Sequence, residues 1–338
     1  MDKQKLESLP PPPGVIGSLR AGFDAVASHV WLIFVPLALD IVLWLGPRLS
    51  VDGLLRPFVR YMFLQARRGV PTSEMNQFLE TQTIFLDGLQ SFNLLSLVSK
   101  FRTFPIGISS LLAQKMPAAG TPFGEQSVMQ ISSLPLLIGI AFVLTMLGWV
   151  GGGLYFRWVS GTTLGQEETG ISLLRAVIQT LILSVCWLIG LMMVLLPVMF
   201  VLTLLALINP ILANGAIFVI LLLAFWLVVP LFFMPHGIFA RRQNAFVSAR
   251  TSLRMARFTF PTSSMFIISV IILSQGMNYL WSVPSNDSWM TLVGIAGHAF
   301  ITTAVLAASF VYYRDMNVWL QTVFEQWQKT RSAPTQRA

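Results

Sequence analysis

Long runs of apolar residues, separated by short polar breaks, are the dominant pattern of this chain. Six runs are long enough, or nearly so, to cross a bilayer core of about 30 Å as helices, which takes roughly 20 residues. They occupy residues 29–46, 134–158, 173–207, 211–239, 265–281 and 290–313. Each run is continuously apolar, whereas the strands of a membrane barrel alternate over about ten residues. The pattern therefore predicts an all-α integral membrane protein with about six transmembrane helices.

Short polar breaks predict how these helices are paired. Asn209-Pro210 separates the third run from the fourth, and 284–287 separates the fifth from the sixth. Both breaks are typical of tight turns, so we expect helical hairpins there, three in all with the first two runs. The third run is too long for one straight span, and we expect its start to lie along the interface. The predicted organisation is a cytoplasmic N-terminal segment with an interfacial helix, a first span, an extracytoplasmic amphipathic segment, a five-span bundle and a cytoplasmic tail. These correspond to residues 1–28, 29–46, 47–131, 132–313 and 314–338.

The long connection at 47–131 has helix-like apolar spacing, although it is too charged to cross the membrane. Leu54, Phe58 and Tyr61 recur at helical intervals in its first part, and Phe78 and Phe85 do so in its second. Helices with this pattern lie in the membrane interface. We expect an amphipathic helical cap on the membrane or over the bundle, with a further short interfacial helix at 106–112.

The distribution of Lys and Arg predicts the orientation. The turns after the third and fifth runs carry no basic residue, while the ends of the runs on the other side carry many. Basic residues in short loops stay on the cytoplasmic side. Both termini are therefore predicted to be cytoplasmic. The segment 47–131 is placed outside despite its charges, because long loops translocate largely regardless of charge.

Three short stretches resemble one another and suggest an internal repeat. Residues 17–23, 172–178 and 251–257 each carry Ser-Leu-Arg or Leu-Leu-Arg shortly before an apolar run. We interpret them as interfacial elbow helices on the cytoplasmic face. Their arginines, Arg20, Arg175 and Arg254, are candidates for contacts with lipid headgroups. The alternative is that such a tripeptide is simply common before a membrane span.

These elbows, the six runs and the sequence Tyr312-Tyr313-Arg314-Asp315-Met316 carry a family resemblance. The chain resembles a broad set of bacterial multi-pass membrane proteins, and it is similar to the membrane domain attached to some glycerophosphodiester phosphodiesterases. The resemblance covers the spans and leaves out 47–131. It implies a bacterial plasma membrane. The phosphodiesterase catalytic domain has no counterpart here, so the resemblance implies no enzyme activity.

Composition agrees with a membrane location and narrows the partners. Charged residues make up 11% of the chain and apolar residues 55%, whereas soluble domains have about 25% charged residues. The net charge of +8 lies mostly beside apolar runs. Anionic lipid headgroups, rather than nucleic acid, are therefore the expected partners of the basic residues. The sequence identifies no protein partner.

Motifs for catalysis, metals and cofactors are missing from the sequence. The single cysteine and three histidines have no spacing typical of a metal site, and no nucleophile elbow or phosphate-binding loop is present. Gly151-Gly152-Gly153 lies inside an apolar run, where it indicates close helix packing or a bend. We therefore expect no cofactor and favour a protein without enzyme activity.

Asp40 and His298 are the candidate binding residues. Both lie inside apolar runs, and a carboxylate at such a depth costs about 2.5–3.5 kcal/mol on insertion scales. Asp40 should therefore face the bundle and find a partner, for which His298 is at comparable depth. An Asp–His pair could relay protons or bind a cation; the alternative is a hydrogen bond that packs helices.

Two functions follow from these observations. The first is a non-enzymatic structural or accessory component of the bacterial envelope, favoured by the missing catalytic motifs. The alternative is a transporter or permease-type subunit that uses Asp40 and His298 in an intramembrane site, favoured by the repeat and by prolines within the runs.

Overall fold

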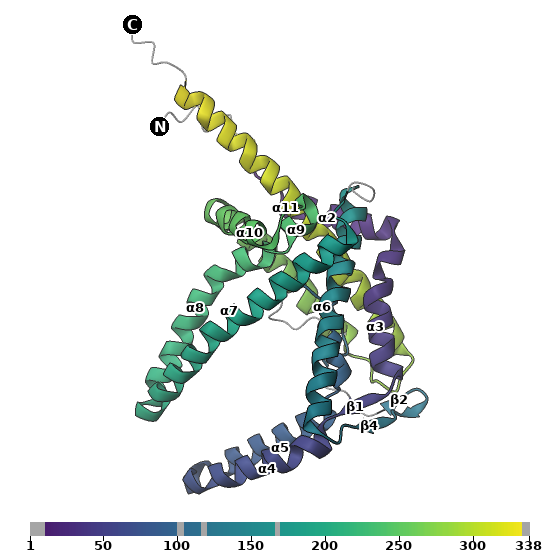
Figure 1. Ribbon diagram of the computed structural model, residues 1–338, viewed down its shortest axis with the longest axis vertical. Helices are drawn as coiled ribbons and strands as arrows, with labels where there is room; N and C mark the ends of the chain where they lie inside the picture. Colours follow the sequence, from purple (N-terminus) through teal and green to yellow (C-terminus); the bar gives the residue numbers. More distant parts are fainter. Residues whose placement is uncertain (1–10, 100–104, 116–119, 166–169, 333–338) are drawn as a thin grey trace.

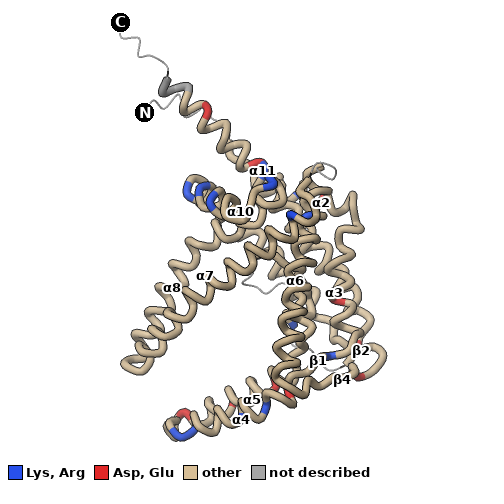
Figure 2. Tube along the Cα trace, viewed as in Figure 1, with Lys and Arg blue, Asp and Glu red and all other residues tan. Residues whose placement is uncertain are grey.

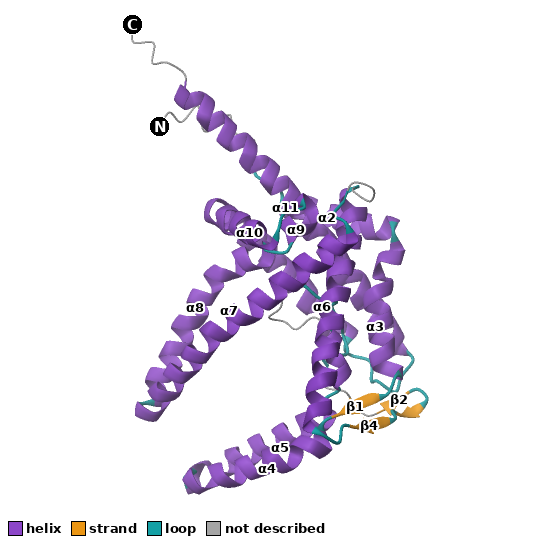
Figure 3. Ribbon diagram, viewed as in Figure 1, coloured by secondary structure: helices purple, strands orange, loops and turns teal. Residues whose placement is uncertain are grey.

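A bundle of long helices, with two helical hairpins that extend from it, makes up the computed structural model (Figure 1). The structure describes residues 11–99, 105–115, 120–165 and 170–332. The predicted segments 1–28 and 314–338 therefore extend at both ends beyond the described residues. Helices account for nearly all regular structure, and the few short strands lie together at one end (Figure 3). We call this end the strand end, and the opposite one, where α2 begins and α11 ends, the terminus end.

Within the residues that the structure describes, five helical stretches are long and apolar enough to cross a membrane. They are α6 (Leu134–Leu164), α7 (Leu173–Ile208), α8 (Pro210–Phe233) with α9 (His236–Arg241), α10 (Ala245–Trp281) and α11 (Met290–Ser332). A sixth stretch passes the same test only as a bent pair: α2 (Val15–Ser28), followed by η1 (Val30–Ile33) and α3 (Phe34–Leu45). The chain is thus an all-α multi-pass membrane protein with five or six spans.

The expected elbows differ from one another in the structure. The chain bends by 97° between α2 and the helix that starts at Val30. In α10 the backbone leaves helical geometry at Thr259, two residues before Pro261. By contrast, α7 runs unbroken for 36 residues, about 54 Å at 1.5 Å per residue. The third run is therefore one continuous helix from Leu173, and no break separates its expected interfacial start from the rest.

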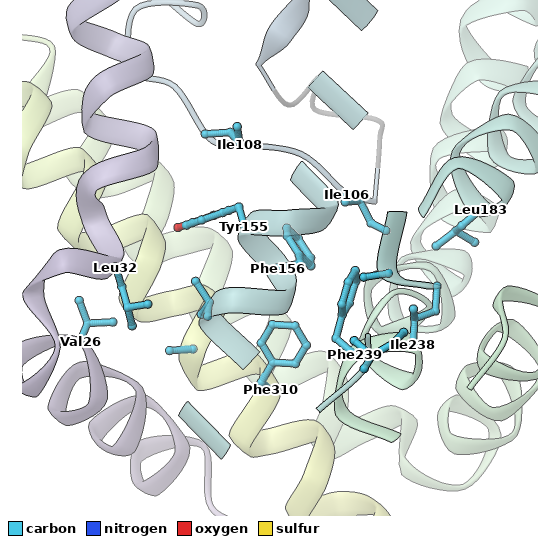
Figure 4. Close-up of a cluster of buried hydrophobic side chains, with 14 of the residues drawn as sticks. Val26, Leu32, Ile106, Ile108, Tyr155, Phe156, Leu183, Ile238, Phe239 and Phe310 are labelled. Atoms are coloured by element: carbon cyan, nitrogen blue, oxygen red, sulfur yellow. The ribbon is translucent and has the colours of Figure 1, made fainter. Parts of the chain in front are cut away.

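The bundle core forms where α2, α6, α9 and α11 meet. Gly22 of α2 permits the closest approach, since a Cβ there would clash with the backbone and side chain of Ala308 in α11. Buried aromatic side chains fill the space beside it: Phe156 packs edge-on against Phe310 at 6.0 Å between ring centroids. Figure 4 shows this cluster, with Ile106 and Ile108 approaching it on a loop. Apolar burial thus holds together segments far apart in sequence.

The hairpin of α7 and α8 extends from this core and carries no Lys, Arg, Asp or Glu from Ala176 to Phe233 (Figure 2). None of the most apolar 18-residue window of α7 is buried within the protein. Side chains such as Met193 and Phe200, at 73% and 65% exposure, therefore face the bilayer. This surface requires lipid around it, because water would not solvate it.

Segment 47–131 contains a second hairpin and small strands. The hairpin consists of α4 (Asp52–Ala66) and α5 (Met75–Ser91), joined by η2 (Arg67–Gly69) and η3 (Thr72–Glu74). No residue of α4 or α5 is buried, and the pair projects from the strand end rather than covering the bundle (Figure 1). After η4 (Leu94–Val98) come β2 (Gly120–Thr121), β3 (Gly124–Glu125) and β4 (Val128–Gln130), and β4 pairs in parallel with β1 (Arg48–Ser50). The predicted helix at 106–112 is wrong, because these residues form irregular chain inside the bundle.

Candidate functional site

Residues 105–115 enter the bundle from the strand end as irregular chain. Ile106, Ile108 and Leu111 are 1%, 6% and 3% exposed, so this segment is enclosed by helices and not laid on the surface. Ile106 and Ile108 belong to the same buried cluster as Tyr155 and Phe156 of α6 (Figure 4). Irregular backbone at membrane depth is tolerated only where protein buries it or water reaches it. We call residues 105–115 the re-entrant segment.

Glycines of α6 leave the space in which the re-entrant segment lies. A Cβ at Gly152 would be 2.6 Å from the Cα of Gly107, and one at Gly148 would be 2.7 Å from the carbonyl oxygen of Val98. At Gly153 a Cβ would clash with Thr180 of α7. Gly152 is about 27 Å along α6 from Leu134, by the rise of a helix, so the segment reaches deep into the bundle. The predicted role of the triple glycine in close packing agrees with these contacts.

Asp40 caps the turn of the re-entrant segment. Its side chain is completely buried in α3, and it accepts hydrogen bonds from the Ser110 hydroxyl at 2.5 Å and from the backbone N–H groups of Leu111 and Leu112 at 3.0 and 3.1 Å. The Ser110 hydroxyl in turn accepts from the N–H of Ala113 at 3.0 Å. Each of these donors would cost free energy if it were buried without an acceptor. Asp40 therefore satisfies the polar groups of a turn that could not otherwise be buried.

His298 forms a hydrogen bond with the same segment at Ser109, the residue before Ser110. Its Nδ1 lies 2.6 Å from Oδ1 of Asn278, and its Nε2 lies 3.2 Å from the hydroxyl of Ser109. A carboxamide oxygen only accepts, so Nδ1 carries the proton and Nε2 accepts from Ser109 in the neutral ring. The amide nitrogen of Asn278 donates to Oε1 of Gln114 at 3.3 Å, which fixes the amide orientation. One polar network thus links α10, α11 and the re-entrant segment.

The structure brings Asp40 and His298 to one segment without pairing them. Asp40 bonds to Ser110 and the two residues after it, while His298 bonds to Ser109. Within the described ranges no hydrogen bond or ion pair joins Asp40 to His298 directly. Their side-chain partners are Ser110 for Asp40, and Ser109 and Asn278 for His298.

The three predicted headgroup arginines lie in different environments at the terminus end. Arg20 is 83% exposed, and its guanidinium is 3.6 Å from the carboxylate of Asp24. Arg175 donates to the carbonyl oxygen of Arg242 at 2.9 Å. Arg254 lies over the ring of Phe324, 5.0 Å from its centroid. Of these three interactions, only that of Arg20 is an exposed ion pair. Such a pair contributes little free energy, so Arg20 can readily exchange Asp24 for a lipid headgroup.

Ser109, Ser110, Asn278 and Gln114 belong to this network and were missed by sequence reasoning. The available signal was the adjacent serine pair inside the apolar stretch 106–112, which fits a buried turn as well as an interfacial helix. Nothing local distinguishes the two, because the partners of Ser110 and Ser109 lie 70 and 189 positions away.

Two cavities lie near the ends of the bundle. One of about 240 Å³ at the strand end is lined in part by Trp44, Gln114 and Lys115, and one of about 310 Å³ at the terminus end is lined in part by Arg157 and Thr162. Neither Asp40 nor His298 lines either of them. In the part of the chain that the structure describes, no group of three or more His, Cys, Asp and Glu side chains could hold a metal ion.

Comparison with known proteins gives no relatives. No family model matches the chain, and no curated protein and no solved structure matches it significantly.

Proposed function

We propose that this chain is a non-enzymatic structural or accessory component of the bacterial plasma membrane. One observation carries the proposal: the buried polar side chains of Asp40 and His298 both form hydrogen bonds with the re-entrant segment inside the bundle. We also propose that the chain is related to the membrane domain of glycerophosphodiester phosphodiesterases. Two bends at the expected elbows support this relation: the 97° bend after α2 and the kink at Thr259.

Burial of the polar residues favours this function over transport. A group that relays protons or binds a transported ion must exchange with water on both sides in turn. Asp40 is 0% and His298 is 1% exposed, and both have protein partners. The two carboxylate oxygens of Asp40 already accept three hydrogen bonds. The site is therefore built to stabilise one conformation.

We further propose that the terminus end faces the cytoplasm and binds anionic lipid headgroups. Arginines gather there on α10, with Arg250, Arg254 and Arg257 on its exposed side, and Figure 2 shows them at the end of that helix. Juxtamembrane basic residues are worth about 1 kcal/mol each near anionic lipids. Arg20, Arg175 and Arg254 are the proposed contacts from the three elbow stretches.

Cysteine labelling tests the topology. With Cys186→Ala as background, we expect Thr72→Cys and Ser285→Cys to react with an impermeant maleimide added outside intact cells, because both positions are exposed at the strand end. Gln321→Cys, exposed on α11, should react only after the membrane is opened. Labelling of Gln321→Cys and Ser285→Cys from the same side would contradict the proposed orientation.

Flux measurements test the accessory role against transport. In proteoliposomes with an internal pH-sensitive dye, we expect the wild-type protein to pass protons no faster than empty liposomes, because Asp40 has no contact with water. The matched control is Asp40→Asn, which should leave the flux equally low. A proton or sodium flux that the wild type supports and a folded Asp40→Asn variant loses would favour the transporter function and overturn the proposal.

A further inference from the structure

The cavity at the strand end has walls from five separate parts of the chain. Trp44 lies in the last turn of α3, and Ser91 ends α5. Gln114 and Lys115 end the re-entrant segment, and Gln126 and Asn286 come from two connecting loops. Its volume of about 240 Å³ far exceeds the roughly 30 Å³ that one water occupies in the liquid. It can therefore hold a small organic molecule.

Specific hydrogen bonds fix these walls. The side-chain nitrogen of Gln126 donates to the carbonyl oxygens of Leu43 and Trp44 at 3.0 and 2.6 Å, which closes the end of α3. The indole of Trp44 donates to the carbonyl oxygen of Asn286 at 2.7 Å. Lys115 donates to the carbonyl oxygen of Pro284 at 2.7 Å. Since Asp40 caps the turn that leads to Lys115, the cavity is part of a preformed structure.

Charge in the cavity is of one sign. Lys115 is the charged residue among its lining residues, which include no Asp or Glu within the described chain. Its ammonium group has three donors, and the carbonyl oxygen of Pro284 takes one of them. Burial lowers the pKa of Lys115, because the group has lost part of its hydration. An anion in the cavity would restore that lost stabilisation.

We propose that this cavity is a binding site for a small anion, a carboxylate or phosphate. Lys115 binds the anionic group, while Trp44 forms an apolar wall. The proposal does not depend on the accessory role above, since the flux measurement and the test below report on different residues.

Charge-selective labelling tests the anion preference without knowledge of the natural ligand. In the Cys186→Ala background, Ser91→Cys places a thiol on the cavity wall, and Thr72→Cys places one on the exposed tip between α4 and α5. The readout is the ratio of labelling rates by a sulfonate and a quaternary ammonium methanethiosulfonate. We expect this ratio to be at least about fivefold higher at Ser91→Cys than at Thr72→Cys, a free-energy difference of about 1 kcal/mol.

Adding Lys115→Met should bring the ratio at Ser91→Cys down to that at Thr72→Cys. Arg60→Met, which removes one positive charge from the exposed side of α4, is the matched control and should leave the ratio high. Lys115→Arg keeps the charge and guards against a loss of folding. Equal ratios at Ser91→Cys and Thr72→Cys, or a high ratio that survives Lys115→Met, would overturn the anion site.

Ligand binding gives an independent readout. O-phosphoserine and inorganic phosphate both carry the anionic group, and each should raise the melting temperature of the purified protein saturably. Lys115→Met should weaken this effect by at least about tenfold, the loss expected for one hydrogen bond to a charged group. Arg60→Met should leave it unchanged. If neither compound shifts the melting temperature, the proposal is wrong.

Discussion

Asp40→Ala is expected to destabilise the protein by about 3 kcal/mol or more. Three donors of the re-entrant segment, the Ser110 hydroxyl and the N–H groups of Leu111 and Leu112, lose their acceptor together. Each buried donor left unsatisfied costs about 1–3 kcal/mol, and such losses do not add fully. A residue whose only role was to bind a transported ion would show no such penalty.

Unfolding in mild detergent, followed by tryptophan fluorescence, measures this loss. Asp40→Asn should be milder, because the amide keeps one acceptor oxygen at nearly the same position. Asp24→Ala is the control for loss of a carboxylate, since Asp24 is 70% exposed in its ion pair with Arg20 and should change stability by less than about 1 kcal/mol. Wild-type stability of Asp40→Ala would contradict the capping role.

Alanine substitutions of two glycines in α6 should change the stability of the protein in opposite directions. A Cβ at Gly152 would lie 2.6 and 2.9 Å from the Cα and nitrogen of Gly107, both backbone atoms that cannot rotate away. Gly152→Ala should therefore cost about 1–3 kcal/mol as the re-entrant segment is displaced. Gly139→Ala, on the same helix with nothing within 4 Å, should stabilise by up to about 1 kcal/mol through helix propensity.

The same unfolding assay compares these two variants directly. Because both introduce one methyl group into α6, their difference isolates the contact with Gly107 from effects on the helix itself. If Gly152→Ala were as stable as Gly139→Ala, the segment would not lie against α6 as described.

The parts of the fold that depend only on neighbouring residues can be predicted from the sequence. The apolar runs that lie in α6, α8 and α11 are each continuous over more than the roughly 20 residues that a bilayer core requires. The turn at Asn209 was equally clear, because Asn209 caps α8 by accepting from the N–H of Ile211. These features need only neighbouring residues to be recognised.

The candidate site depends on contacts that no local pattern encodes. The sequence indicates that Asp40 is a buried polar residue in need of a partner, as the structure shows, but the direct partner is not His298. The actual partner, Ser110, lies in a stretch whose apolar spacing also fits an interfacial helix. What decides between the two structures is the space left by Gly152 on a different helix. Only the three-dimensional arrangement shows that space.

Hydrogen–deuterium exchange of the re-entrant segment tests the central claim most directly. In the wild type, a peptide covering residues 105–115 should exchange far more slowly than one from the exposed α4–α5 hairpin. The segment lies inside the bundle, and the N–H groups of Leu111 and Leu112 are bonded to Asp40. Asp40→Ala should abolish this protection, whereas Gly139→Ala should leave it intact. Rapid exchange of 105–115 already in the wild type, at the rate of the α4–α5 hairpin, would contradict the account.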